Sequence, residues 1–235
     1  MGLLDAFAIE DRFGLETSCR TLKFDLTEQA QHHLLLYVSL LRKWQPAQNL
    51  VGPGTLADVW SRHVTDSLQL VEFIDEWTAN SPVKSLSGYD LGSGAGLPGA
   101  VLALATADRT VTPFYEMTLV ESNARKAAFL RTVSRETGVR ITVQATRIEE
   151  ATAVLPVPDF ITARALAPLA KLTDLAKPWM QEGATAFFHK GGEYVREMEK
   201  WPDAAIHDVV EKVSKIDEAS RLLRIDRRDV RRGAS

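Results

Sequence analysis

One segment of the chain combines glycines with an acidic residue at a spacing that suits ligand binding. Residues 90–99 read DLGSGAGLPG and stand between a short apolar run and a helical pattern. Glycines at alternate positions let the backbone turn sharply and approach a ligand closely. Backbone N–H groups at the start of the following helix can hold a carboxylate or a phosphate. This segment is therefore the first candidate for a binding site.

Two ligands compete for this turn. Residues 94–99 match the G-x-G-x-x-G pattern of dinucleotide sites, and an acidic residue, Glu121, ends the next apolar run. Sites for the methyl donor S-adenosylmethionine place an acidic residue before G-x-G-x-G, as Asp90 stands before Gly92, Gly94 and Gly96. The Asp90 carboxylate would repel a pyrophosphate, so the pattern favours the methyl donor. A structural turn without a ligand is the third alternative.

Glu121 is the second acidic candidate in this site. It follows four residues of a strand pattern, Met117 to Val120. A carboxylate at a strand end can accept two ribose hydroxyls through charge-assisted hydrogen bonds, which are stronger than neutral ones. We interpret Glu121 as the ribose ligand, and a solvated residue at the rim of the sheet is the alternative.

Two other methylation chemistries fit the sequence poorly. Methylation of a pyrimidine at C5 needs a cysteine nucleophile, and the single cysteine, Cys19, lies far from any expected strand end. Methylation of exocyclic DNA amines commonly uses an Asp/Asn-Pro-Pro-aromatic turn, where this chain has Ala163-Arg164-Ala165-Leu166. One cysteine also excludes a disulfide framework and a Cys₄ zinc site, and we expect no metal.

Short apolar runs alternate with helical stretches after residue 84, which is typical of βαβ units and a parallel sheet. The expected strands are 85–90, 117–121, 140–145, 159–163 and 184–189, and the helices between them are 98–107, 123–137, 147–154 and 168–177. Two further strands, 205–213 and 221–227, have no full helix between them. We therefore expect a mostly parallel, Rossmann-like α/β sheet with an antiparallel C-terminal edge hairpin.

The first 80 residues have a helical pattern instead. One helix is expected from Thr27, its N-cap, to Trp44, with Pro46 stopping it. A second is expected to start at a capping box of Thr55 with Asp58 and to run to about residue 74. We divide the chain into a helical extension (1–80), a Rossmann-like domain with the glycine turn (81–227) and a basic tail (228–235), for which an RNA-facing surface and a disordered segment are the two alternatives.

Composition bounds the possible classes. The 235 residues are 45% hydrophobic, enough for one sizeable core, and no stretch is long enough to cross a membrane. The start lacks the pattern of a secretory signal, so a cytoplasmic location is expected. A net charge of −3 argues against a general nucleic-acid binder, but six arginines against two aspartates from Arg221 onward make the C-terminal end basic.

Several segments, taken in order, resemble one family. They are LLRKW at 40–44 with Asn49-Leu50, RHVTDS at 62–67, the glycine segment, FLR at 129–131, RIEE at 147–150, ARA at 163–165 and HKG at 189–191. In these the chain resembles the bacterial small-subunit ribosomal RNA guanine-N7 methyltransferases, the RsmG/GidB family. The resemblance covers most of the chain, roughly residues 27–224.

The resemblance implies a class I S-adenosylmethionine-dependent methyltransferase with an N-terminal helical extension. It implies that Gly92 and Leu97 line the donor site, that Glu121 holds the ribose, and that Ile148 with Glu149 flanks the adenine. The implied reaction is methyl transfer to N7 of a guanine in 16S ribosomal RNA, within the 30S subunit or an assembly intermediate. No DNA or membrane partner is expected, and a monomer is favoured.

Guanine N7 carries a lone pair and no proton, so such a site must mainly align its reactants. The resemblance puts Arg164 at the donor pocket, and Arg164 and Lys190 are candidate catalytic residues that position guanine O6 or a phosphate. The alternatives are an ion pair of Arg164 with Glu149 or Asp90, and a solvated loop position for Lys190.

The candidate RNA-binding residues are Arg62, His63, Arg125, Arg131 and Lys190. An i,i+4 pair of Arg62 with Asp66 on one helix and an ordinary solvated face are the simpler interpretations. Three functions stay open on the sequence: the ribosomal RNA methyltransferase, an NAD(P)-dependent oxidoreductase using the same glycine turn, and a nucleotide- or ribosome-binding module without turnover.

Overall fold

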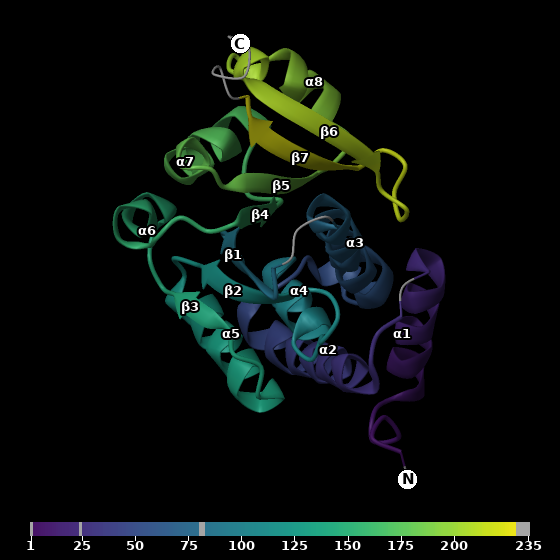
Figure 1. Ribbon diagram of the computed structural model, residues 1–235. Helices are drawn as coiled ribbons and strands as arrows, with labels where there is room; N and C mark the ends of the chain where they lie inside the picture. The colour runs from purple at the N-terminus through teal and green to yellow at the C-terminus, as the bar shows by residue number, and fades with distance from the viewer. Residues whose placement is uncertain (1, 24, 80–82, 229–235) are drawn as a thin grey trace.

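The computed structural model describes residues 2–23, 25–79 and 83–228. A seven-stranded sheet in the order β3-β2-β1-β4-β5-β7-β6 crosses the molecule (Figure 1). Its strands are β1 Ser85–Leu91, β2 Phe114–Val120, β3 Thr142–Gln144, β4 Phe160–Arg164, β5 Thr185–Lys190, β6 His207–Val213 and β7 Arg221–Arg227. The first five are parallel, and β7 runs antiparallel to both β5 and β6. The predicted sheet and its edge hairpin are confirmed.

Helices cover both faces of this sheet (Figure 1). They are α1 Ile9–Leu22, α2 Glu28–Gln48, α3 Asp66–Thr78, α4 Gly99–Thr106, α5 Ala124–Thr137, α6 Ile148–Val154, α7 Leu169–Gln181 and α8 Tyr194–Glu199, with short helical turns at Pro53–Thr55, Trp60–Thr65 and Ala204–Ile206. Elements α1 to α5 share one apolar core with one face of the sheet, and α6 and α7 pack with the other face. The N-terminal helices are thus fastened to the sheet that carries the glycine turn.

Local sequence signals explain the helix starts that matter for the site. The Thr27 side chain accepts a hydrogen bond from the Ala30 N–H at the start of α2, as predicted. The Asn123 side chain accepts bonds from two N–H groups at the start of α5, immediately after Glu121. This cap fixes the chain where β2 turns into α5, and so fixes the loop that carries Glu121.

Two expectations about the N-terminal half were wrong. Helix α2 continues through Pro46 to Gln48, because a proline in the last turns of a helix removes only one hydrogen bond. The Thr55 hydroxyl donates to the Gly52 carbonyl and contacts His63 instead of capping a helix. The segment Trp60–Thr65 is a π-helical turn that leads into α3.

The expected domain boundary at residue 80 and all of the basic tail except Arg228 lie outside the described residues. Within the described residues, no helix is both long enough and apolar enough to cross a membrane.

Candidate functional site

The glycine turn links β1 to α4 across the end of the sheet. Gly92 has a φ of +64°, and a Cβ there would lie 2.5 Å from Leu166 Cδ1. Only glycine tolerates both the left-handed backbone and this close approach. The turn after β4, which contains Leu166, therefore lies directly against the turn after β1.

A cavity of about 370 Å³ opens beside this turn. Its lining residues are Gly92, Gly94, Val120, Glu121, Ser122, Lys126, Thr146, Arg147, Ile148, Glu149, Ala165, Leu166 and Leu175. Five of the predicted cofactor residues are brought together here by the loops that follow β1 and β2 and by α6: Gly92, Gly94, Glu121, Ile148 and Glu149. The volume lies in the usual range for small-molecule sites. We call it the donor cavity.

The Glu121 carboxylate lies at the centre of this arrangement. Its Oε2 accepts a 2.8 Å hydrogen bond from the Gly94 N–H, and its Oε1 accepts a 2.7 Å bond from the Asn123 N–H. Each carboxylate oxygen has two lone-pair sites, so each can accept one further donor. Glu121 can therefore hold two hydroxyls of a ligand while it keeps the glycine turn in place.

The other predicted cofactor residues on the turn, Asp90, Gly96 and Leu97, do not line this cavity. Asp90 is fully buried beneath the turn, where its Oδ1 accepts a bond from the Thr162 hydroxyl and its Oδ2 has no partner among the described residues. Burial raises the pKa of the Asp90 carboxyl to about 6. Asp90 therefore supports the turn from below.

A second, larger cavity of about 660 Å³ adjoins the first. Its lining residues are Asp58, Ser61, Arg62, His63, Asp66, Arg164, Ala165, His189, Lys190, Gly191, Ile216, Asp217 and Ser220. Ala165, which has a φ of +51°, lines both cavities. The residue before it, Arg164, lines the second cavity, whereas the residue after it, Leu166, lines the donor cavity. We call the second one the acceptor cavity and the boundary at Ala165 the seam.

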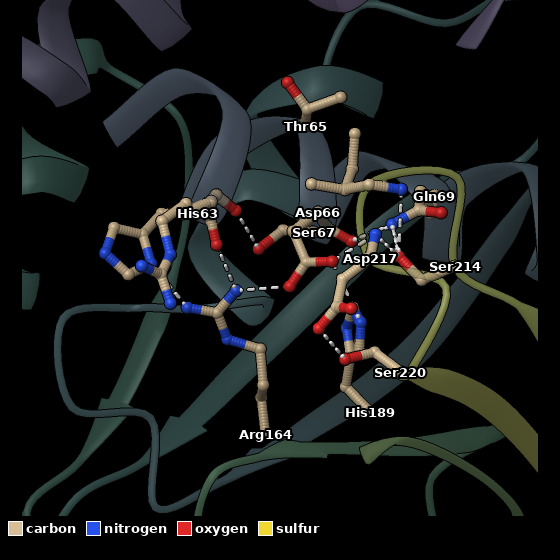
Figure 2. A network of polar contacts seen from close by, with 12 residues as sticks. His63, Thr65, Asp66, Ser67, Gln69, Arg164, His189, Ser214, Asp217 and Ser220 are labelled. Carbon is tan, nitrogen blue, oxygen red and sulfur yellow. Dashed lines mark hydrogen bonds and ion pairs between the residues drawn. The ribbon is translucent and has the colours of Figure 1, made fainter. Parts of the chain in front are cut away.

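Arg164 is at the centre of a polar network in the acceptor cavity (Figure 2). Its Nη1 donates to Asp66 Oδ2 at 2.8 Å and to the Arg62 carbonyl at 3.1 Å, and its Nη2 donates to His63 Nδ1 at 2.7 Å. The ion pair that was the alternative for Arg164 does form, but its partner is Asp66 and not Glu149 or Asp90. The simpler interpretation of Arg62, a pair with Asp66 on one helix, was wrong, because the Asp66 carboxylate pairs with Arg164.

The contacts of His63 fix its tautomer. A guanidinium only donates, so Nδ1 must accept the bond from Arg164, and Nε2 carries the proton and donates to the Thr55 hydroxyl at 2.8 Å. Burial and the adjacent Arg164 charge lower the pKa of His63 to about 4. His63 is therefore neutral at physiological pH and does not add positive charge to the acceptor cavity.

Lys190 lies at the end of β5, where its side chain is 9% exposed. Its ammonium lies 2.7 Å from Glu197 Oε2 and donates to the Ala167 carbonyl at 2.9 Å. The solvated-loop interpretation of Lys190 was wrong. Arg125 and Arg131 are exposed on α5 and line neither cavity.

One wall of the acceptor cavity was not predicted from the sequence. The turn between β6 and β7 contributes Ile216, Asp217 and Ser220. Gln69 of α3 holds this turn, because its Nε2 donates to Ser214 Oγ at 3.1 Å and its Oε1 accepts from the Lys215 N–H at 2.6 Å (Figure 2). Gln69 stands among apolar residues of α3, and a polar residue in such a place indicates a buried hydrogen-bond partner. The sequence does not show that this partner lies in a distant turn.

His189 was also missed as a site residue. It is buried at the end of β5, and its Nε2 lies 3.0 Å from Asp66 Oδ1. Throughout the part of the chain that the structure describes, no three His, Cys, Asp or Glu side chains are grouped to hold a metal ion.

Comparison with solved structures identifies the fold. A ribosomal protein L11 methylase from Lactobacillus delbrueckii subsp. bulgaricus superposes with a TM-score of 0.53 at 16% identity, covering 70% of this chain and 80% of that one. The magnesium protoporphyrin IX methyltransferase of Synechocystis PCC 6803, solved with bound SAM, gives 0.51 at 11% identity over 82% and 97%. The predicted class I methyltransferase fold is confirmed.

Comparison of sequences is more specific. The family described as rRNA small subunit methyltransferase G (GidB) matches residues 30–223. Ribosomal RNA small subunit methyltransferase G of Brucella ovis is 39% identical over 208 residues, 88% of this chain and 92% of that protein. The Methylorubrum extorquens protein of the same name is 41% identical over 192 residues, 81% and 85% of the two chains. The chain therefore belongs to the rRNA small subunit methyltransferase G family.

Proposed function

We propose that this chain transfers a methyl group from S-adenosylmethionine to N7 of a guanine in 16S ribosomal RNA. The observation that carries the proposal is the pair of cavities that meet at Ala165, one lined by the glycine turn with Glu121 and the other by polar residues. Family membership supports the same activity. The NAD(P)-dependent oxidoreductase and the module without turnover are not favoured, because the related proteins are named methyltransferases.

The donor cavity fits S-adenosylmethionine by the chemistry of its lining. Glu121 would accept the ribose hydroxyls, the Gly92–Gly94 backbone would face the methionine end, and Ile148 with Leu166 would enclose the adenine with apolar surface. The bound donor supplies an electrophilic methyl on a sulfonium, and the sulfur takes back the bonding electron pair when N7 attacks. The residues of this chain would hold the sulfonium methyl and guanine N7 in line for the transfer.

The acceptor cavity would hold the target guanine beside the seam. A basic side chain usually reads guanine through both O6 and N7, but here N7 must stay free to react. Arg164 uses three of its five N–H groups on Asp66, His63 and the Arg62 carbonyl, which leaves two donors for O6 or a phosphate. Since no proton leaves N7, alignment is the main requirement, and effective alignment can supply up to about 7–11 kcal/mol.

Recognition of the RNA beyond one base would use exposed cations. Arg62 lines the acceptor cavity, and Arg125 and Arg131 are exposed on α5, outside both cavities. The net charge of −3 makes general attraction to RNA weak. We therefore propose that the substrate is the assembled 30S subunit or an intermediate of its assembly, and that the protein acts on it in the cytoplasm as a monomer.

Calorimetry with S-adenosylhomocysteine and with NADH tests the donor site, and methyl transfer from tritiated S-adenosylmethionine to 30S subunits and to naked 16S RNA tests the acceptor. We expect binding of S-adenosylhomocysteine only, and label in the RNA of 30S subunits. Binding of NADH alone would refute the methyl-donor assignment, and S-adenosylhomocysteine binding without label in either RNA would favour a module without turnover.

A further inference from the structure

We propose that Asp66 balances the charge of Arg164 at the seam, so that a cationic methyl donor can be held beside this arginine. The inference rests on the proposed function, since it concerns how the chain tolerates the charge of S-adenosylmethionine. Asp66 does not line the donor cavity, so it would act through Arg164 as a positioning residue.

The placement of Arg164 creates the electrostatic problem. A methyl group that passes from the donor cavity to the acceptor cavity must cross where the two meet, at Ala165. The reactive end of the donor therefore lies next to the residue that follows Arg164 in the chain. A sulfonium carries a full positive charge, and a second unpaired cation beside it would raise the free energy of the bound donor.

Burial makes this repulsion matter. The side chains of Arg164 and Asp66 are each 15% exposed, so water screens the guanidinium poorly. Asp66 Oδ2 lies 2.8 Å from Arg164 Nη1, and Asp66 is the carboxylate that pairs with Arg164 within the described residues. His63, the other side chain in contact with the guanidinium, is neutral and cannot offset its charge.

The second buried cation at the seam is paired in the same way. Lys190 lies beside Glu197 at 2.7 Å, with side-chain exposures of 9% and 22%. Each buried cation that lines the acceptor cavity near Ala165 thus has its own carboxylate. This arrangement leaves hydrogen-bond donors at the seam without a net positive charge there.

Asp66 is itself held by a second side chain, which suits a positioning role. The Gln69 side chain donates to Asp66 Oδ1 at 3.1 Å (Figure 2), whereas His189 Nε2, which lies 3.0 Å from the same oxygen, forms no hydrogen bond to it. Its other oxygen is left for Arg164. The carboxylate therefore fixes both the charge balance and the direction of the guanidinium.

Comparing the binding of S-adenosylmethionine and S-adenosylhomocysteine isolates the charge, because the second ligand lacks the sulfonium. We would measure both dissociation constants by calorimetry for the unaltered protein, Asp66→Asn, and the double variant Asp66→Asn with Arg164→Gln. Asp208→Asn is the matched control, because it removes the carboxylate of an exposed aspartate–arginine pair with Arg228, on β6 at the far edge of the sheet.

For Asp66→Asn we expect S-adenosylmethionine to bind about tenfold more weakly, or worse, while S-adenosylhomocysteine changes by about twofold or less. The double variant also lacks the Arg164 guanidinium, so the ratio of the two ligands' dissociation constants should return to that of the unaltered protein. If Asp66→Asn fails to fold, the double variant is compared with the unaltered protein directly. The control should keep the ratio of the unaltered protein.

Equal weakening of both ligands in Asp66→Asn would overturn the inference and leave Asp66 a purely structural residue. A ratio in the double variant that stays as low as in Asp66→Asn would overturn it too. If the unaltered protein bound neither ligand, the proposed function would fail first, and this inference with it.

Discussion

Replacement of Glu121 by alanine tests the donor site most sharply. The carboxylate is 8% exposed, and it already accepts bonds from the Gly94 and Asn123 N–H groups at 2.8 and 2.7 Å. Its two remaining lone-pair sites are those we assign to the ribose hydroxyls. Hydrogen bonds to charged groups contribute about 1.5–3 kcal/mol each. In the variant, the ribose hydroxyls form hydrogen bonds with water instead, which offsets part of the loss.

We therefore expect Glu121→Ala to weaken the binding of S-adenosylhomocysteine by at least about 1.4 kcal/mol, a tenfold rise in the dissociation constant. Calorimetry at neutral pH measures it. Glu116→Ala is the matched control, because it removes an exposed glutamate from β2, the strand that Glu121 directly follows, and Glu116 lines neither cavity. Thermal unfolding of both variants reports whether the loop has lost its fold.

If the dissociation constant of Glu121→Ala stayed within about twofold of the unaltered value, Glu121 would not hold the ribose. A twofold change corresponds to much less free energy than the loss of one hydrogen bond to a charged group. Loss of binding together with loss of cooperative unfolding would mean instead that the carboxylate mainly supports the glycine turn. A folded variant with selectively weakened binding is the result that fits the geometry.

Two further predictions concern stability. Gly99→Ala should lower the free energy of unfolding by about 1–3 kcal/mol, because the new Cβ would lie 2.5 Å from Asp90 Cβ. Gly54→Ala, with nothing within 4 Å, should change denaturant unfolding little, and equal effects would contradict the packing argument. The lowered pKa of His63, about 4 against 6.5, means that the folded protein prefers the neutral ring, so its contribution is present above pH 6.5 and is lost as the pH falls toward 4. Between pH 7 and pH 4.5, the free energy of unfolding should fall by up to about 3 kcal/mol less in His63→Gln than in the unaltered protein. If the free energy of unfolding fell equally in both proteins, the lowered pKa of His63 would be refuted.

Local signals carried much of the fold. The alternation of strands and helices after residue 84 predicted a parallel sheet, and the missing helix between the last two strands predicted the antiparallel edge. The glycine turn and Glu121 were predicted because each is recognised from a short local pattern. The first is a run of alternate glycines after a strand, and the second is a carboxylate directly after the next strand. Ile148 and Glu149 came from the family resemblance, and they line the same cavity.

Long-range choices were not readable from the sequence. Asp66 has Arg62 four residues before it, yet it pairs with Arg164, because the end of β4 brings the guanidinium to α3 with little exposure to water. Pattern alone also cannot tell that Gln69 reaches the turn at Ser214. Such partners depend on which strand ends meet, and this is decided by the packing of the whole sheet.

The most direct test is the chemical identity of the product. The 30S subunits would be incubated with the protein and S-adenosylmethionine, and the digested 16S RNA would then be examined by mass spectrometry. A 7-methylguanosine that is absent without the protein is the expected result. Methylation of another atom or another base, or unmodified RNA from a protein that binds S-adenosylhomocysteine, would contradict the proposed reaction.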